Sequence, residues 1–430
     1  MANEEKHKKK KGFSRILKIL GPGLITGAAD DDPSGIATYS QTGAQFGYGQ
    51  LWSILFLYPL MTAVQEACAR IGAVTKKGIA SVVKEHYNRT ILYGVIFLVV
   101  LANTINIGAD IGAMGATVRL IFPSISFTAI ILFFAALMLV LEIFISYKKY
   151  ARILKWLAIT MLVYPATLFL ISAPWGTILK ATFLPHIEFS ATFLFIIVGV
   201  IGTTISPYMF FWQASEEVEE EIEDGEINKR VVSNGFIKNM RIDNALGMLF
   251  SNIISWAIIV VTGTVLNKGG VTNIATAADA AKALVPLVHT FPNAGFIAEI
   301  IFGIGIIGLG LLSVPVLAGS AAYAFSEAFN WNEGLYRKLK EAHGFYGVIT
   351  IATIIGLIIN FVGIDPIKAL VVAAVVNGVV SIPLIFIIIM IASNKKIMGK
   401  YTSGWLSKTF LWISFFAILI SAIFMFLEMF

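Results

Sequence analysis

The sequence predicts an all-α protein that crosses a membrane many times, and three observations lead to this fold class. Of the 430 residues, 57% are hydrophobic and only 13% are charged, with a mean hydropathy of +0.81. Eleven apolar runs are each long enough to cross a bilayer. Two of these runs are interrupted by proline, glycine and polar residues. This composition excludes a soluble domain.

The apolar runs define eleven expected transmembrane helices. They cover residues 16–45, 50–72, 91–122, 125–146, 150–173, 192–215, 242–266, 294–326, 345–363, 366–393 and 409–429. Most of the 32 lysine and arginine residues lie in the N-terminal tail and in the loops on one side of these helices. This bias predicts a cytoplasmic N-terminus and an extracytoplasmic C-terminus. Residues 1–15 form a basic cytoplasmic tail, and residues 16–430 form a single transmembrane domain.

The first apolar run is interrupted at Asp-Asp-Asp-Pro-Ser-Gly, residues 30–35. Unpaired charge and unpaired backbone groups each cost several kcal/mol in lipid. Pro33 lacks an N–H and Gly35 tolerates non-helical conformations, so we expect the helix to unwind from Asp30 to Gly35. A broken helix with acidic side chains is typical of an ion site in a secondary transporter. An aqueous loop, or a cluster of capping aspartates, is the alternative.

The sixth run is interrupted in a similar way, from Gly202 to Tyr208 in the sequence Gly-Thr-Thr-Ile-Ser-Pro-Tyr. Breaks in the first and sixth of ten helices are what a five-plus-five inverted repeat produces. The repeats would cover about 16–173 and 192–393, with an extra helix at 409–429. A simple kink at Pro207 is the alternative, because prolines are common in membrane helices.

Other features narrow the chemistry of the site. Cys68 is the only cysteine and none of the five histidines lies within an apolar run, so neither a thiolate site nor a histidine-built metal site is expected. No nucleophile–base pair or cofactor motif is present, and we expect no enzyme activity, no cofactor and no nucleic-acid partner. The acidic run at 216–226 could gather cations, but a solvated helix end is the favoured interpretation.

Several short motifs are shared with one family of membrane transporters. In the first two spans they are Gly21-Pro22-Gly23, Asp32-Pro33, Phe46-Gly47-Tyr48, Leu51-Trp52, Gln65 and Ala69-Arg70-Ile71-Gly72. Later in the chain they are Pro207, Ala318-Gly319, Tyr323-Ala324 and Ile382-Pro383. On these residues the chain resembles the Nramp family of divalent-metal transporters. The resemblance implies an inverted repeat of the LeuT type with helices 1 and 6 broken.

The resemblance also implies which residues hold the ion, and the chain departs from the family pattern at several of them. The family has Asp-Pro-Gly-Asn at the first break, where this chain keeps the carboxylate of Asp32 but has Gly35 in place of the asparagine. The family has Met-Pro-His at the second break, where Ser206 replaces the thioether and Tyr208 the histidine. The backbone carbonyl that the family offers falls at Thr203.

Residues tied to proton transport in the family also differ. Gln213 stands where the family has a second histidine in the sixth helix. In the third helix Asn106 and Ala109 replace an acidic pair, and Asp110 lies one residue out of register, which is about 100° around a helix. We therefore expect transport that is not coupled to protons, since no histidine is available near the ion.

Loss of the thioether favours oxygen-bound ions such as Mg2+ and Mn2+ over softer transition metals. Loss of the methionine and asparagine side chains also predicts a roomy pocket, which suits Mg2+ because this ion keeps much of its water. The expected metal site consists of Asp32, Asp31, Gly35, Thr203 and Ser206. Residues that could line its cavity are Asp30, Ser34, Tyr208, Gln213, Asn377 and Asp110, although a helix-packing hydrogen bond is the favoured role for Asn377.

The predicted function is a secondary transporter that carries Mg2+, and also Mn2+, into the cytoplasm by alternating access. The chain looks like a bacterial branch of Nramp-related magnesium transporters, which implies a location in a bacterial-type inner membrane. A proton-coupled Mn2+ or Fe2+ transporter of the same family is an alternative. A sodium-coupled amino-acid transporter is another, although three aspartates would repel a substrate carboxylate. The divalent ion and the bilayer are the expected partners, and no oligomer is required.

Overall fold

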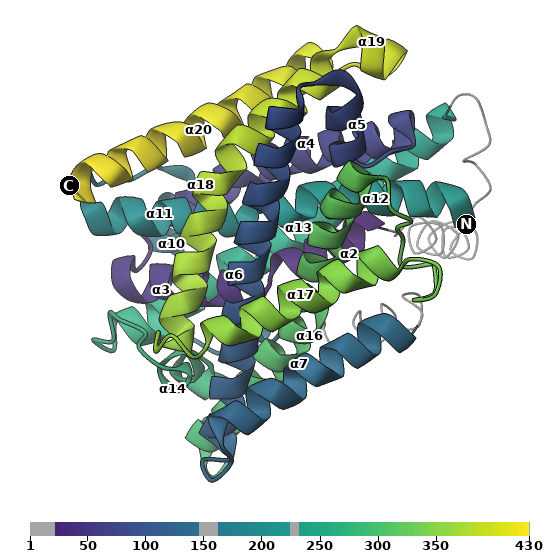
Figure 1. The fold of residues 1–430 in the computed structure, drawn as a ribbon. Coiled ribbons are helices and arrows are strands. Elements are labelled where there is room, and N and C mark those ends of the chain that lie inside the picture. The colour runs from purple at the N-terminus through teal and green to yellow at the C-terminus, as the bar shows by residue number, and fades with distance from the viewer. Residues whose placement is uncertain (1–21, 146–161, 224–231, 430) are drawn as a thin grey trace, which may run out of the picture.

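The computed structural model describes residues 22–145, 162–223 and 232–429, and these residues fold as helices joined by short loops (Figure 1). The first half of the chain contains α2 (Pro22–Asp30), α3 (Pro33–Phe46), α4 (Leu51–Thr75), α5 (Ile79–His86), α6 (Arg89–Ile121), α7 (Phe127–Phe144), α9 (Val163–Leu168) and α10 (Trp175–Phe183). The second half contains α11 (Ala191–Thr204), α12 (Pro207–Glu223), α13 (Asn234–Thr262), η2 (Gly263–Asn267), α14 (Ala277–Ala281), η3 (Lys282–Leu284), α15 (Val285–Val288), α16 (Ala294–Phe329), α17 (His343–Ile359), α18 (Pro366–Ser393), α19 (Lys395–Met398), η4 (Gly399–Tyr401) and α20 (Trp405–Met429).

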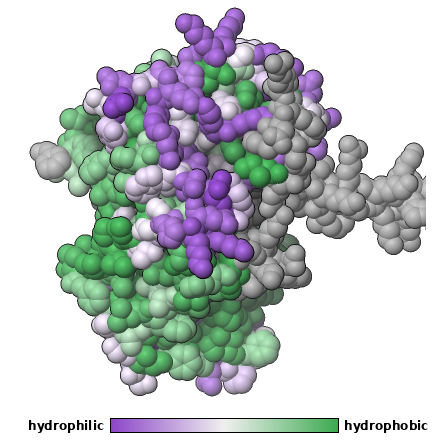
Figure 2. Space-filling model, turned by 45° about the vertical axis from the view of Figure 1, so that its right-hand side comes forward, coloured by the Kyte–Doolittle hydropathy of each residue, from purple (hydrophilic) through white to green (hydrophobic). Residues whose placement is uncertain are grey.

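The long helices fall where the apolar runs predict them. Within the described residues, eight helices are long and apolar enough to cross a membrane, namely α4, α6, α7, the α11–α12 pair, α13 with η2, α16, α18 and α20. The helix α17 is shorter but also apolar. The expected fifth span and the basic N-terminal tail lie largely outside the described residues. Figure 2 shows hydrophilic residues gathered at the top and centre of one face, above a hydrophobic flank.

The two helix breaks are shorter than the sequence predicts. Only Asp31 and Asp32 separate α2 from α3, and only Ile205 and Ser206 separate α11 from α12. The expected unwinding through Gly35 and Tyr208 was therefore wrong in extent. The physical reason is that a proline follows each break at the first position of the next helix, where its missing N–H costs nothing and its fixed φ favours helix.

The half-helices pack in the pattern of an inverted repeat. The half-helix α3 packs against α13, and α12 packs against α4. The helices α3 and α12 are equivalent, because each one follows a break. The helices α4 and α13 are equivalent as the next long helix of each repeat. Exchanging the two repeats therefore converts one contact into the other. The helices α6 and α16 also contact each other extensively. This packing places both breaks in the interior of the bundle.

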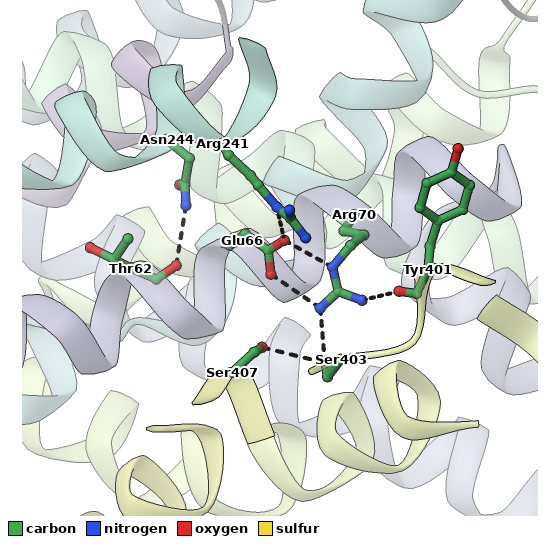
Figure 3. Close-up of polar contacts among 8 residues, drawn as sticks. All are labelled: Thr62, Glu66, Arg70, Arg241, Asn244, Tyr401, Ser403 and Ser407. Carbon is green, nitrogen blue, oxygen red and sulfur yellow. Dashed lines mark hydrogen bonds and ion pairs between the residues drawn. The ribbon is translucent and has the colours of Figure 1, made fainter. Parts of the chain in front are cut away.

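A buried arginine ties three helices together (Figure 3). Arg70 on α4 donates to both carboxylate oxygens of Glu66, at 2.9 and 3.1 Å. It also donates to the Tyr401 carbonyl at 2.5 Å and to the Ser403 hydroxyl at 2.8 Å, just before α20. Arg241 on α13 donates to the same Glu66 carboxylate at 2.8 Å. The network fixes α4 relative to α13 and to the start of α20.

The acidic run at the end of α12 is largely buried, so the expectation of a solvated helix end was wrong. Glu216, Glu217 and Glu221 are 5%, 1% and 0% exposed. The cause is tertiary packing, because α12 lies against α4 and α16. Gln213 donates to Glu217 Oε1 at 2.8 Å, and Lys76 Nζ lies 3.7 Å from Glu221 Oε2. Residues 224–226 of the run lie outside the described residues.

Candidate cation site at the broken helices

Asp32 lies at the N-cap of α3, and its carboxylate accepts three hydrogen bonds. Its Oδ1 accepts from the Ser34 hydroxyl at 2.6 Å and from the Gly35 backbone N–H at 2.7 Å. Its Oδ2 accepts from Asn106 Nδ2 on α6 at 2.9 Å. The capping arrangement is thus present for Asp32. An ionised carboxylate offers about four lone-pair sites, so capping leaves Asp32 able to bind a cation as well.

Further oxygen atoms that could accept from or bind to a ligand lie at the two breaks. Among the described residues, Asn106 Oδ1 and Thr203 Oγ1 are buried and have no hydrogen-bond partner. The Ser206 hydroxyl lies 2.8 Å from both the Gly202 and the Thr203 carbonyl oxygens. Its single hydrogen is therefore used within α11, while its lone pairs stay available. Carboxylate, hydroxyl, amide and carbonyl oxygens together are the ligands that hard divalent cations prefer.

The pocket beside Gly35 is closed in this conformation. A Cβ atom added at Gly35 would lie 3.1 Å from Thr203 Oγ1 and 3.3 Å from the Asp30 carbonyl oxygen. The expectation of open space at this position was therefore wrong for this arrangement of the helices. The reason is that α3 packs closely against α11, so that Thr203 fills the space next to Gly35.

Asp30 and Asp31 face a different helix from Asp32. The Ser251 hydroxyl on α13 lies 2.5 Å from Asp30 Oδ2 and 3.2 Å from Asp31 Oδ1. The Ser255 hydroxyl, one turn later, also lies 3.2 Å from Asp31 Oδ1. The structure thus brings Asp31 together with Asp30 against α13, whereas Asn106 on α6 contacts Asp32. The sequence analysis missed both serines, although polar residues four apart in an apolar helix were a usable signal.

Tyr208 connects the broken helices, whereas Gln213 bonds within its own helix. The Tyr208 hydroxyl donates to the Ala29 carbonyl at 2.8 Å and so links α12 to α2. Ser320 on α16 donates to the Tyr208 carbonyl at 2.7 Å. Gln213 donates to Glu217. No hydrogen bond joins either side chain to Asp32 among the described residues. Tyr208 therefore links α12 to α2, whereas the Gln213–Glu217 bond lies within α12.

Asp110 and Asn377 are buried near the breaks. Asp110 lies four residues after Asn106, on the same face of α6, and its Oδ2 accepts from the Ser313 hydroxyl at 2.6 Å. In the described part of the chain, neither polar atom of Asn377 has a hydrogen-bond partner. The expected helix-packing bond of Asn377 was therefore wrong. Close contact between Gly378 and Gly202 brings this part of α18 against the end of α11.

Four buried carboxyl groups lie at the site without a basic partner among the described residues. Asp30, Asp31, Asp32 and Asp110 are each at most 1% exposed, and no ion pair joins any of them to a basic side chain within the described ranges. Buried charges without a counter-charge are costly. No three acidic, thiol or imidazole groups in the described residues are placed to hold one metal ion. A cation here would therefore take most of its ligands from neutral oxygens.

The chain is similar to known proteins over most of its length. The family model described as natural resistance-associated macrophage protein-like matches residues 23–428. The divalent metal cation transporter MntH of Caldanaerobacter subterraneus is 27% identical over 400 residues, which cover 90% of this chain and 88% of the relative. The MntH protein of Bacillus subtilis is 25% identical over 397 residues, covering 91% of this chain and 87% of the relative.

Solved structures share the fold. The manganese transporter of Eremococcus coleocola matches with a TM-score of 0.74 at 16% identity, covering 97% of this chain and 87% of that chain. The structure of MhsT in complex with L-phenylalanine matches with a TM-score of 0.61 at 15% identity, covering 95% and 98%. These likenesses confirm the predicted all-helical fold of the LeuT type. With a family model that matches almost the whole chain, the protein belongs to the natural resistance-associated macrophage protein (Nramp) family.

Proposed function

We propose that the protein is a secondary transporter that carries divalent cations into the cytoplasm by alternating access. The observation that carries this proposal is the set of buried oxygen atoms around Asp32, between the ends of two broken helices. The names of its relatives as divalent metal cation transporters support the class of substrate. A sodium-coupled amino-acid transporter is disfavoured, because four buried carboxylates would repel the carboxylate of such a substrate.

The helix ends suit a cation. The last carbonyl groups of α2 and α11 have no partner in their own helices, and they carry the negative end of the helix dipole. The Thr203 carbonyl lies in the last turn of α11. An ion held by Asp32 would gain from these carbonyls, and the Tyr208–Ala29 bond would couple movements of α12 and α2. Rearrangement of the half-helices around the ion would then expose it to one side at a time.

Magnesium is the preferred ion in this proposal, with manganese second. The Ser34 hydroxyl and the Asn106 amide lie at hydrogen-bond distance from Asp32, and Thr203 and Ser206 supply hydroxyl and carbonyl oxygens at the second break. None of these groups is a sulfur ligand. Hard oxygen ligands give no advantage to softer transition metals. Mg2+ keeps several waters when it is bound, so the site would widen around a hydrated ion in an open conformation.

We also propose that transport is independent of protons and that the N-terminus is cytoplasmic. Tyr208 and Gln213 occupy the positions at which the resemblance places histidines. Tyr208 donates to Ala29 on α2, and Gln213 donates to Glu217 within α12. Neither side chain ordinarily changes its charge near neutral pH. The excess of basic residues in the tail and in alternate loops supports a cytoplasmic N-terminus in the bacterial inner membrane.

Uptake into proteoliposomes tests the transport proposal. Purified protein in liposomes that contain a magnesium-sensitive dye is expected to admit Mg2+ under a negative-inside potential, and external Mn2+ should compete. Empty liposomes and liposomes with Asp32→Asn protein serve as controls. A signal for L-amino acids, or uptake of Cd2+ and Fe2+ that Mg2+ does not reduce at millimolar concentration, would contradict the proposal.

A further inference from the structure

The helices α2 and α13 approach each other closely beside Asp30 and Asp31. A Cβ atom added at Gly27 would lie 2.3 Å from the carbonyl oxygen of Gly247, which leaves no room for any side chain there. Ser251 and Ser255 follow Gly247 at intervals of four residues on the same face of α13. This backbone-to-backbone packing therefore holds both serine hydroxyls against the two carboxylates.

The hydroxyl hydrogens do not suffice for the contacts in this cluster. Ser251 Oγ is within hydrogen-bond distance of Asp30 Oδ2 and Asp31 Oδ1. Ser255 Oγ is 3.2 Å from Asp31 Oδ1 and 3.0 Å from the Ser251 carbonyl oxygen. Each hydroxyl has one hydrogen, so two hydrogens face these four acceptor contacts. If both carboxyl groups are ionised, at least two of the contacts join oxygen atoms with no hydrogen between them.

Two more carboxylate oxygens point into the same buried region without any partner. Asp30 Oδ1 and Asp31 Oδ2 accept no hydrogen bond from the described residues, although the two side chains are only 0% and 1% exposed. No described lysine, arginine or histidine forms an ion pair with either one. A buried carboxylate pair without hydrogen bonds or a counter-charge is strongly unfavourable. The cluster therefore lacks positive charge.

We propose that Asp30, Asp31, Ser251 and Ser255 form a second site for a divalent cation, separate from the site at Asp32. Two carboxylates match the charge of one divalent ion, and the hydroxyls can turn their lone pairs toward it. All donors are hard oxygens, which select ions such as Mg2+ and Mn2+. The partners of Asp32 lie on α3 and α6 instead, so each site has its own ligands. The inference concerns equilibrium binding and does not depend on transport.

Counting bound Mn2+ by electron paramagnetic resonance tests the second site in the purified full-length protein. The Asp32→Asn variant removes the charge of the first site and is expected to keep one bound Mn2+ per chain, which added Mg2+ displaces. Adding Asp30→Asn and Asp31→Asn to this variant should abolish the remaining binding. The matched control instead adds Glu142→Gln to Asp32→Asn. Glu142 is a buried residue on α7, and its carboxylate oxygens also lack partners among the described residues. This control variant should keep the bound Mn2+.

A milder variant covers the case in which the triple variant does not fold. Ser251→Ala with Ser255→Ala, in the Asp32→Asn background, keeps both carboxylates and is expected to weaken Mn2+ binding at least tenfold, which is about 1.4 kcal/mol. Asp32→Asn protein that folds but binds no Mn2+ would overturn the proposal. Displacement of the bound Mn2+ by Na+ but not by choline would also overturn the proposal, because it would indicate a site for a monovalent ion.

A shared proton is the remaining alternative, and it has its own signature. An infrared band of a protonated carboxylic acid that persists at saturating Mn2+ and disappears with Asp30→Asn and Asp31→Asn would refute the cation site, because a bound metal ion displaces the proton. The test of the second site can be distinguished from the test of the transport proposal. Wild-type protein that takes up no Mg2+, while Asp32→Asn still binds Mn2+, would refute transport and leave the second site standing.

Discussion

At the scale of single residues, Asp32 combines two roles that are usually separate. As the N-cap of α3 it satisfies the Gly35 N–H, and as a buried carboxylate it supplies charge at the helix break. Asn106 orients its second oxygen from α6. A capping residue is ordinarily replaceable by another small polar residue at little cost. The two roles can therefore be separated by substitution.

Replacing Asp32 with asparagine removes the charge but keeps an oxygen that can cap α3. We expect Asp32→Asn to abolish divalent-cation uptake while the midpoint of thermal unfolding changes little, because asparagine is as good an N-cap as aspartate. Asp365→Asn is the matched control, since Asp365 also precedes a proline and caps α18. It should leave uptake unchanged. Normal uptake by Asp32→Asn would exclude Asp32 as the ligand.

The ion preference is expected to depend on Ser206 and Gly35. Ser206→Met together with Gly35→Asn would add a thioether and a carboxamide, and we expect a shift of preference toward Mn2+ with weaker competition by Mg2+. The added Cβ at position 35 would lie 3.1 Å from Thr203 Oγ1, so Thr203 must shift to admit the asparagine side chain. Competition between the two ions in liposome uptake measures the shift. Ser206→Met alone separates the effect of the sulfur, and unchanged competition would refute the role of these positions.

At the scale of helices, the fold depends on polar links between elements far apart in the chain. The Arg70 network joins α4, α13 and the start of α20, and the Tyr208 hydroxyl joins the two broken helices. Helices in a bilayer gain little from the hydrophobic effect against each other, so close packing and hydrogen bonds decide their arrangement. Substitutions at these links should therefore affect stability more than equally apolar changes on the lipid-facing surface.

Arg70→Leu is expected to destabilise the protein by about 3 kcal/mol, because it leaves buried acceptors without a donor. The loss would appear as a lower midpoint of thermal unfolding in detergent. Arg241→Leu is the control, because this side chain is 55% exposed and its ion pair with Glu66 contributes about 1 kcal/mol or less. Equal effects of the two substitutions would contradict the structural role of the buried arginine.

Glu333, in the loop between α16 and α17, should make stability depend on pH. Burial, together with the neighbouring Glu327 and Glu219, raises the pKa of Glu333 from 4.5 to about 9. The folded protein therefore binds a proton that the unfolded chain releases between these values, so this group's contribution to stability falls as pH rises through that window. Glu333→Gln should reduce the fall in thermal midpoint, whereas Glu341→Gln at an exposed position should not. An unchanged pH profile in Glu333→Gln would contradict this account.

At the scale of the whole molecule, the proposed cycle moves positive charge inward without protons entering alongside the metal ion. Proteoliposomes that contain a pH-sensitive dye, given external Mg2+ under a negative-inside potential, are expected to show metal entry with little acidification. The physical reason is the absence of histidine around the breaks. Addition of a protonophore and acid verifies that the dye responds. Acidification that follows the Mg2+ dose and disappears in Asp110→Asn would identify a proton pathway through α6.

The sequence by itself determined the class of the molecule and the location of its breaks. These predictions depend on local features: long apolar runs, alternate basic loops and two interruptions that contain proline. Each feature can be identified from its own stretch of sequence. The importance of Asp32 followed from the same break and from the family motif around it. The helices of the described residues agree with these predictions.

Tertiary structure decided what each buried polar group touches. The packing of α12 against α4 and α16 buries Glu216, Glu217 and Glu221. The close approach of α2 to α13 turns Asp30 and Asp31 toward two serines more than two hundred residues away, so that neighbouring aspartates contact different helices. Asp32, next in the chain, meets Asn106 instead. Contacts of this kind depend on how distant helices pack, and a local pattern of residue types carries no information about that packing.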